Sequence, residues 1–386
     1  MRCLLPVLPA ATLTLGLALI ACGDNTHDHD HGADAAPGDG DAPIAAPPRA
    51  IAVSGDFATT GVLSVVNVVA GTVQVGAVAG VAGGDPVLRR AGAELLVVNR
   101  ASGDNVTILD LDTLALVDQL GTGAGSNPQD AAVVGTKLYV AALASPDLLV
   151  FDRAAGNALT NISLASLDAV DGHPDCVSVL AVGTRLFVAC GVLDETFAPR
   201  GNGKVAVIDT LTATVTSTFD LPARNPVGLL QATPSAGFFA GDLVLGTVPD
   251  YQDFSTGCLV RISTGASPAA TCATSNAALG GYVNHVEPAG TGGVLWIAAT
   301  GFDAGFDSFG ALRGVDLGSG ALWDEPVSQP GQVIVDLAAC PDDYVVVSDK
   351  AMAGSGLRIF RGTTEVTTAP LGIGMPPGVG NNLVCF

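Results

Sequence analysis

The sequence contains very little positive charge. Only three of its 386 residues are lysine, and 16 lysine and arginine residues stand against 37 aspartate and glutamate residues, for a formal net charge of −21. Binding to nucleic acid needs basic side chains that release counterions from the phosphates, so we expect no nucleic-acid partner. The same shortage argues against electrostatic adhesion to anionic lipid.

Motifs of the common enzyme classes are also missing. We find no Gly-x-Ser-x-Gly elbow, no His-Glu-x-x-His pair, no phosphate-binding loop and no dinucleotide glycine fingerprint. Neither a CxxC pair nor a cysteine and histidine cluster of the kind that holds structural zinc is present. The sequence therefore favours a binding protein over an enzyme.

Long hydrophobic runs are missing apart from the first residues. Met1-Arg2 supplies a positive start, and the apolar run that follows is too short to span a bilayer, which is the layout of a secretory signal peptide. The run ends at Leu19-Ile20-Ala21-Cys22, which resembles the lipobox of bacterial lipoproteins. We predict a signal peptide over residues 1–21 and a lipid on Cys22. The alternative is an ordinary signal peptide with an incidental cysteine.

The expected location follows from this anchor. Acyl groups would hold the chain at the cell envelope, so the membrane is an expected partner through the lipid. Gly23 rather than aspartate follows Cys22, so the inner-membrane retention signal of enteric bacteria is absent. We therefore expect the outer membrane, on its periplasmic or surface-exposed side.

Residues 22–49 contain little that could be buried. They are small, polar and acidic, with several prolines, and we expect a flexible tether. His27, His29 and His31 alternate with aspartates in this segment, and such a group could chelate Zn²⁺, Cu²⁺ or Ni²⁺. The alternative is a solvated acidic spacer, because a site in an unstructured segment must be ordered on binding.

The rest of the chain consists of short apolar, β-branched runs separated by Gly, Asn, Asp and Pro. A pair of such runs recurs seven times at intervals of roughly 50 residues. The first run of each pair begins at Ile51, Leu95, Leu138, Leu186, Leu243, Leu295 and Val345. A repeat of this length with four strands is one blade of a β-propeller. We predict an all-β, seven-bladed β-propeller over residues 50–386, with four-stranded antiparallel blades.

The two ends of the repeat region complement each other. Residues 378–386 have the pattern of an extra strand, whereas the N-terminal unit begins at what is elsewhere the second strand of a blade. We predict that the C-terminal strand pairs in the N-terminal blade and closes the ring, which shields edges that would otherwise be open.

Six cysteines remain once Cys3 is removed with the signal peptide and Cys22 carries a lipid, and an even number in an exported chain indicates disulfides. Two pairs lie symmetrically about a glycine, so each would face directly across a hairpin: Cys176 with Cys190, and Cys258 with Cys272. Cys340 and Cys385 are left to pair, and their bond would lock the last blade to the first.

One stretch carries a resemblance to a known family. The segment from Leu96 to Thr113, followed by Gly125-Ser-Asn-Pro128, resembles the YVTN family of lactonase-like β-propellers, and Lys204 to Thr210 followed by Asn225-Pro226 repeats it. The resemblance covers the second and fourth blades well and the others in outline. It implies a surface or binding protein, whereas the lactonase relatives have catalytic residues that find no counterpart in this sequence.

An aspartate ends the second run of several repeats, at Asp110, Asp152, Asp209 and Asp316. We interpret these residues as turn caps rather than catalytic groups, because a short acceptor at the end of a strand bonds the backbone amides that follow it.

A candidate binding face follows from the topology. In antiparallel blades, the loop from the second to the third strand and the link to the next blade emerge on the same face, and the fourth to sixth blades have enlarged loops there. These loops contain Asp194, Glu195, Phe197, Asp250, Tyr251, Asp253, Phe254, Phe302, Asp303, Phe306 and Asp307. The links into the fourth and sixth blades add His173, His285 and Glu287.

Exposed aromatic side chains offer stacking area to a sugar, a peptide or another amphipathic ligand. Clustered carboxylates could instead coordinate Ca²⁺. The simpler alternative is that the aromatic side chains pack their own loops and the acids are merely solvated.

We therefore predict a lipid-anchored envelope module that binds a protein, glycan or small molecule through this face. The first alternative is a hydrolase, lactonase-like or active on glycans, that uses the carboxylates as metal ligands or as an acid and base pair. The second is a structural repeat protein of the envelope, which would have no pocket.

Overall fold

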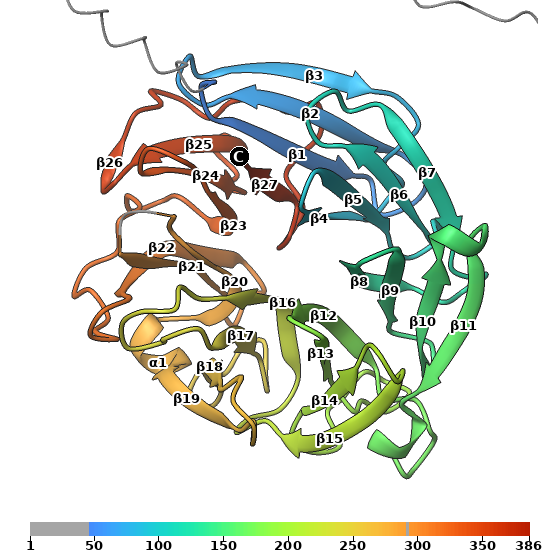
Figure 1. Ribbon diagram of the computed structural model, residues 1–386. Helices are drawn as coiled ribbons and strands as arrows, with labels where there is room; N and C mark the ends of the chain where they lie inside the picture. Colours follow the sequence, from blue (N-terminus) through green and yellow to red (C-terminus); the bar gives the residue numbers. More distant parts are fainter. Residues whose placement is uncertain (1–45, 291–292) are drawn as a thin grey trace, which may run out of the picture. The chain divides into compact units, whose positions relative to one another are not determined.

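The computed structural model, which describes residues 46–290 and 293–386, arranges seven antiparallel sheets in a ring (Figure 1). This confirms the predicted seven-bladed β-propeller within the unit Pro47–Phe386. Residues 1–45, which hold the expected signal peptide, Cys22 and most of the expected tether, lie outside the described residues. No helix in the described part of the chain has the length and hydropathy needed to cross a membrane.

The first four blades each contain four strands, which are named in order from the central channel outward. Blade one contains β27 (Leu383–Cys385), β1 (Arg49–Gly55), β2 (Gly61–Asn67) and β3 (Thr72–Val78). Blade two contains β4 (Pro86–Ala91), β5 (Glu94–Asn99), β6 (Asn105–Asp110) and β7 (Leu116–Gly121). Blade three contains β8 (Pro128–Val134), β9 (Lys137–Ala142), β10 (Asp147–Asp152) and β11 (Ala158–Ser163). Blade four contains β12 (Cys176–Val182), β13 (Arg185–Cys190), β14 (Lys204–Asp209) and β15 (Thr214–Asp220).

Blade five also contains four full strands, whereas blades six and seven differ at their outer edges. Blade five contains β16 (Pro226–Ala232), β17 (Leu243–Thr247), β18 (Cys258–Ile262) and β19 (Ala270–Ser275). Blade six contains β20 (Tyr282–Pro288), β21 (Val294–Phe302) and β22 (Ser308–Asp316), and a bridge between Val315 and Leu322 stands in place of its fourth strand. Blade seven contains β23 (Ile334–Ala339), β24 (Tyr344–Asp349), β25 (Gly356–Arg361) and β26 (Thr364–Glu365). Short helices are η1 (Arg153–Ala155), η2 (Ala165–Leu167) and α1 (Asn276–Leu279).

The apolar runs of the sequence form the second and third strands of the blades. In β5, for example, Leu95 to Val98 are all buried, because neighbouring blades cover both faces of the sheet. The outer strands face solvent and are correspondingly polar; β15 is exposed except for the half-buried Phe219. Within the described residues the hydrophobic core divides into seven clusters, each between two adjacent blades. The blades therefore stabilise one another through burial of apolar surface between them.

The predicted closure of the ring is confirmed. Strand β27 pairs with β1, with Ala50 opposite Cys385 and Ala52 opposite Leu383. The innermost strands contact one another in an unbroken circle from β4 through β8, β12, β16, β20 and β23 to β27 and back to β4. The C-terminal strand thereby supplies the innermost strand of blade one.

All three predicted disulfides are present: Cys176 with Cys190, Cys258 with Cys272, and Cys340 with Cys385. Cys176 lies directly opposite Cys190 in the hairpin of β12 and β13, as expected. Cys272, however, lies opposite Val260 rather than Cys258. The predicted register of that hairpin is wrong, because its turn is not centred on Gly265. The third bond joins blade seven to blade one.

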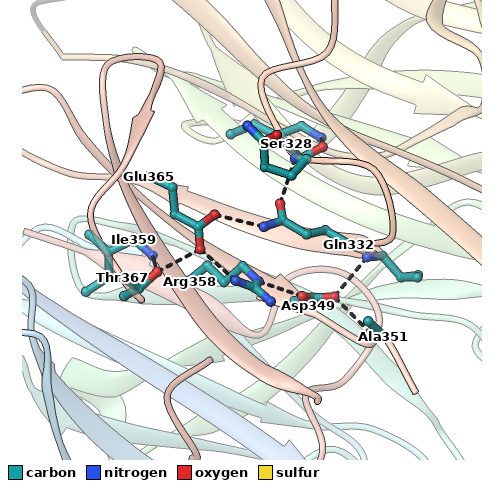
Figure 2. A network of polar contacts seen from close by, with 11 residues as sticks. Ser328, Gln332, Asp349, Ala351, Arg358, Ile359, Glu365 and Thr367 are labelled. Carbon is teal, nitrogen blue, oxygen red and sulfur yellow. Dashed lines mark hydrogen bonds and ion pairs between the residues drawn. The ribbon is translucent and has the colours of Figure 1, made fainter. Parts of the chain in front are cut away.

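A polar network stabilises the outer edge of blade seven, where β26 is only two residues long (Figure 2). Arg358 donates from Nε to Asp349 at 2.6 Å and from Nη1 to Glu365 at 2.7 Å. Gln332, in the link from blade six, donates to the other oxygen of Glu365 at 2.8 Å. Asp349 also accepts the amide of Val333 at 2.8 Å. These bonds attach the link between the two blades to the sheet that follows it.

The strand-end aspartates cap turns, as predicted. Asp110 accepts the amide of Thr113 at 2.8 Å, and Asp316 accepts that of Ser319 at 2.7 Å. Asp152 and Asp209 bond backbone amides two residues further on in the same way.

Candidate functional site

The enlarged loops of blades four, five and six lie on one face of the ring. We call this the rim face: it carries the loops from the second to the third strand of each blade and the links between blades. The loops of blades five and six contact each other through two hydrogen bonds. Gln252 Nε2 donates to the backbone carbonyl of Asp303 at 3.2 Å. The backbone amide of Phe302 donates to the backbone carbonyl of Tyr251 at 3.4 Å. In blade six, the enlargement is mostly a longer hairpin, because β21 and β22 each extend to nine residues.

The mouth of the central channel on the rim face is a cavity of about 430 Å³, which we call the rim cavity. Blades one to six all contribute lining residues. Its aromatic walls are Phe197, Tyr251, Tyr282 and Phe302, from blades four, five and six. The rings of Tyr251 and Tyr282 make an edge-to-face contact at 5.4 Å, and burial raises the pKa of Tyr282 to about 12, so its phenol remains protonated at neutral pH.

Polar side chains from the innermost strands, the links and the loop between β5 and β6 complete this cavity. Asn381, which is 7% exposed, has no hydrogen-bond partner for its Oδ1 among the described residues. Arg100 pairs through Nη2 with Asp85 at 2.6 Å, and its buried Nε has no partner within the described residues. A buried polar atom without a partner costs free energy, and both atoms belong to residues that line the cavity.

A second, smaller hollow of about 300 Å³ adjoins the rim cavity, and Leu143, Leu193 and Phe197 line both. We call it the acidic hollow. It is lined by the predicted residues His173 and Asp194 together with Asp171, Asp175 and Glu195.

Asp175 is the perturbed carboxylate of this hollow. Burial, together with the nearby charges of Asp171 and Asp168, raises the pKa of Asp175 to about 6, although its carboxylate accepts the amide of Leu193 at 2.7 Å. Arg200 offsets part of the negative charge, because it pairs with Asp168 at 2.6 Å and with Asp171 at 2.7 Å. The hollow therefore favours a positively charged group.

Two aspartates among the predicted site residues cap turns that expose two of the predicted phenylalanines to solvent. Asp194 Oδ1 accepts the amides of Thr196 at 2.8 Å and Ala198 at 3.0 Å, and Asp303 Oδ1 accepts those of Gly305 and Asp307 at 2.8 and 2.9 Å. Three residues after each aspartate stands a phenylalanine with a left-handed backbone, Phe197 and Phe306, each with φ of 62°. Blades four and six thus use the same five-residue turn to expose an aromatic ring.

The remaining rim residues have mainly local roles. Asp250 and Asp253 accept the amides of Gln252 and Ser255, each at 2.8 Å. Phe254 packs edge-to-face on Phe309 at 5.3 Å, over a strand position where the glycine Gly301 leaves room for both rings. Asp307 is exposed next to Phe306. The alternative in which these side chains serve their own loops thus describes Asp250, Asp253 and Phe254, but not Phe197, Tyr251 or Phe302.

His285 and Glu287 do not lie on the rim face, and this part of the prediction is wrong. Both belong to β20, two residues apart on the same face of the strand, and they line a cavity of about 540 Å³ at the opposite mouth of the channel. Glu287 Oε2 accepts the amide of Ala339 at 2.9 Å. The link into blade six ends earlier than we expected, so that His285 falls inside the innermost strand.

A ring of buried polar groups separates the two cavities. Arg89 pairs with Asp130 of the next blade, and Asp130 accepts the hydroxyl of Ser178 at 2.7 Å. On the other side of the channel, His285 Nδ1 bonds Asp336, which also accepts the amides of Asn381 and Asn382. Burial lowers the pKa of His285, but the charge of Asp336, its hydrogen bond to the imidazole and the charge of Glu287 together raise it, so that the pKa of the imidazole lies above its ordinary value.

β-Bulges position this ring. The innermost strands of blades three to seven each shift register just before or at the residues that face the channel, as between Pro128 and Asp130, or between Ile334 and Asp336. A bulge redirects side chains and ends regular pairing, which suits a position where strands from several blades converge.

No group of three or more His, Cys, Asp or Glu side chains in residues 46–290 and 293–386 is placed to hold a metal ion. The Ca²⁺ considered for the acidic rim therefore lacks such a cluster in this part of the chain. His27, His29 and His31 lie outside the described residues.

Sequence reasoning missed the polar lining of the rim cavity. Arg100, Gln129, Asn225, Asn284 and Asn381 all line it, and none was among the predicted site residues. Asn225 belongs to the pair Asn225-Pro226 and Gln129 follows Asn127-Pro128, so the Asn-Pro dipeptide at the start of these innermost strands was the available signal.

Comparison with known proteins supports the fold. No protein-family model and no curated protein matches the chain. Among solved structures, it is similar to hydrazine synthase of Kuenenia stuttgartiensis, with 16% identity and a TM-score of 0.50 over 70% of this chain and 75% of that chain. It is also similar to apo AztD from Citrobacter koseri, with 14% identity and a TM-score of 0.53 over 88% of this chain and 98% of that chain. At such identities the likeness concerns the fold, and the chain is thus a seven-bladed β-propeller with these two proteins among its structural neighbours.

Proposed function

We propose that this protein is an envelope binding module whose ligand occupies the rim cavity. The main support for the proposal is the combination of aromatic walls with polar lining side chains in one cavity at the channel mouth. Phe302 and Tyr282 offer apolar area, and Asn381 and Arg100, whose buried Oδ1 and Nε have no partner among the described residues, line the same cavity. Binding sites for small molecules and for side chains of protein ligands combine these features.

The carboxylates in the enlarged loops of blades five and six are not placed as an acid and base pair. Hydrolysis by an acid and base pair needs two carboxyl groups that face one bound substrate. Asp250, Asp253, Asp303 and Asp307 line neither the rim cavity nor the acidic hollow, and three of these four cap their own turns. The rim cavity itself is lined by aromatic, amide and guanidinium groups.

Attachment to the envelope through Cys22 is the second part of the proposal. It rests on the signal-like residues 1–21 and the lipobox-like Leu19-Ile20-Ala21-Cys22. The acidic residues 22–49 would hold the propeller away from the bilayer surface. Metabolic labelling with a palmitate analogue tests this part: the wild-type chain should incorporate the label, and Cys22→Ala should not. Equal labelling of the two chains would contradict the anchor.

Binding at the rim cavity can be tested with the uncharged dye 1-anilinonaphthalene, whose rings suit the aromatic walls and which carries no anion toward the acidic rim face. We expect saturable binding to the full-length protein in detergent. Phe302→Ala removes an aromatic wall and Asn381→Gly removes the unpaired oxygen while keeping a left-handed backbone, so either should weaken binding about tenfold.

The matched control for that experiment is Phe238→Ala. Phe238 is 40% exposed and lies on the opposite face, between β16 and β17, so its removal should leave binding of the dye unchanged. Thermal melting of each variant identifies loss of fold. Folded Phe302→Ala that binds the dye as the wild type does would contradict the rim cavity as the binding site.

A further inference from the structure

Exposed aromatic side chains are concentrated on the rim face. Phe57, Phe197, Tyr251 and Phe306 are 67%, 66%, 49% and 72% exposed, and each lies in the loop from the second to the third strand of its blade. Met352, which is fully exposed, occupies the corresponding loop of blade seven. Because these side chains come from five different blades, a partner that contacts several of them would lie across the mouth of the channel.

The backbone holds three of these rings outward at a cost. Phe57, Phe197 and Phe306 have φ of 57°, 62° and 62°, a left-handed conformation that is unfavourable for a bulky residue. In blade one, Asp56 Oδ1 accepts the amides of Ala58, Thr59 and Thr60, each at 2.8 to 2.9 Å, as Asp194 and Asp303 do for their own turns. The carboxylate caps thus fix the rings in solvent instead of letting them fold inward.

Negative charge surrounds these rings. The rim-face loops and links carry Asp56, Asp85, Asp104, Asp168, Asp171, Asp175, Asp194, Glu195, Asp250, Asp253, Asp303 and Asp307. Their basic residues are Arg100, Arg200, Arg224 and Lys350. Arg100 and Arg200 are already paired with rim carboxylates. Lys204 lies at the rim end of β14. The opposite face carries basic and acidic side chains at or next to its strand ends: Arg49, Arg90, Lys137, Arg153, Arg185 and Arg361 together with Glu94, Asp110, Asp152, Asp209 and Asp316.

We propose that the rim face docks a protein segment in which basic side chains alternate with aliphatic ones. The aliphatic side chains would cover the exposed Phe57, Phe197 and Phe306 and reach into the rim cavity. The basic side chains would meet the acidic hollow and the faces of the same aromatic rings, which attract cations. Complementary charge would orient the partner, and burial of apolar surface would hold it.

This inference rests on the proposed function, since both use the rim face, and the two can be tested separately. The probes are three synthetic peptides of equal length: alternating lysine and leucine, alternating lysine and glycine, and alternating glutamate and leucine. Their binding to the full-length protein in detergent is measured by fluorescence anisotropy at physiological salt. The lysine and leucine peptide should bind about tenfold more tightly than the lysine and glycine peptide, and the glutamate and leucine peptide should bind most weakly.

Two sets of variants assign that binding to the rim. Phe57→Ser with Phe306→Ser removes two rings outside the rim cavity, and binding of the lysine and leucine peptide should fall about tenfold. A second variant combines Glu195→Gln, Asp250→Asn and Asp307→Asn, which removes three negative charges and keeps the turns. Its binding of the lysine and leucine peptide should be weaker and should depend less on salt. The control pair Leu211→Ser and Phe238→Ser, exposed on the opposite face, should bind as the wild type does.

The outcomes separate the two proposals. If Phe57→Ser with Phe306→Ser retains binding of the anilinonaphthalene dye but loses the peptide, the docking surface is supported independently of the cavity. If the Phe302→Ala variant no longer binds the dye but still binds the lysine and leucine peptide, the docking surface is again supported independently of the cavity. The inference would be overturned if the Phe57→Ser and Phe306→Ser variant bound the lysine and leucine peptide as the wild type does. It would also be overturned if the glutamate and leucine peptide bound as tightly as the lysine and leucine peptide.

Discussion

Nη1 of Arg89, in the innermost strand of blade two, donates a 3.0 Å hydrogen bond to the backbone carbonyl of Leu230 in the innermost strand of blade five. The same guanidinium pairs with Asp130 of blade three, which is fully buried. Arg89 therefore connects three blades across the channel. A propeller is otherwise stabilised between adjacent blades, so this side chain adds contacts that neighbour packing does not provide.

Removal of this guanidinium should destabilise the ring strongly. Arg89→Met leaves the buried carboxylate of Asp130 without its cation, and we expect the free energy of unfolding to fall by about 3 to 5 kcal/mol. Urea unfolding followed by circular dichroism measures the change. Arg90→Met is the matched control, because Arg90 is exposed at the next position and should cost less than about 0.5 kcal/mol. Similar losses in both variants would show that the buried ion pair is not the source of the effect.

The disulfides should differ in their contributions. Cys340 and Cys385 are separated by 45 residues and Cys176 and Cys190 by 14, and a longer closed loop restricts the unfolded chain more. Loop-closure entropy gives about 4 kcal/mol for the first bond and about 3 kcal/mol for the second. Paired cysteine-to-serine variants, unfolded in urea, measure both.

Ring closure adds to the first loss, because β27 is only three residues long and Cys385 is its last residue. A larger loss from Cys176→Ser with Cys190→Ser than from Cys340→Ser with Cys385→Ser would contradict this ranking. Deletion of residues 378–386 should lower the melting temperature further than either pair, since it also removes the strand.

Asp175 should make stability depend on pH. Its folded-state pKa is raised to about 6 from 3.8, so the folded protein holds this proton more tightly than the unfolded chain does. Its contribution to stability is therefore favourable at about pH 4 and is lost as the pH rises through 6. Asp175→Asn should unfold like the wild type near pH 4 and be about 1 kcal/mol more stable at pH 7.5, allowing for the solvent around a half-buried group.

Asparagine suits this position, because its amide oxygen can still accept the Leu193 amide and it tolerates the left-handed backbone at φ of 55°. Urea unfolding of both proteins at the two pH values provides the measurement. A difference of equal size at pH 4 and pH 7.5 would show that the charge of Asp175 is not its cause.

The local pattern predicted much of the fold. Runs such as Val106 to Asp110 indicate a strand that is buried on both faces, and their sevenfold recurrence sets the number of blades. The pairing of Cys176 with Cys190 followed from spacing about one glycine. Such features depend on residues near one another in the sequence, where periodicity and turn chemistry act directly.

The rim site could be predicted only in part. Phe197, Tyr251 and Phe302 were expected on one face because loop topology fixes the side on which a loop emerges. His285 was misplaced because the start of an innermost strand, and the bulge within it, depend on packing against the other blades. The predicted register failed at Cys272 because the turn is centred on Ala266 and the register shifts again between Leu259 and Val260.

The blade count, the closing strand and the disulfide partners could all be read from the amino-acid sequence, because each follows from repetition or spacing along the chain. Folding in three dimensions was needed to establish which polar groups meet in the channel, as Arg89 does with Leu230, and which rings stay exposed. Those contacts join residues from different blades, and their geometry is set by how seven sheets pack around one axis.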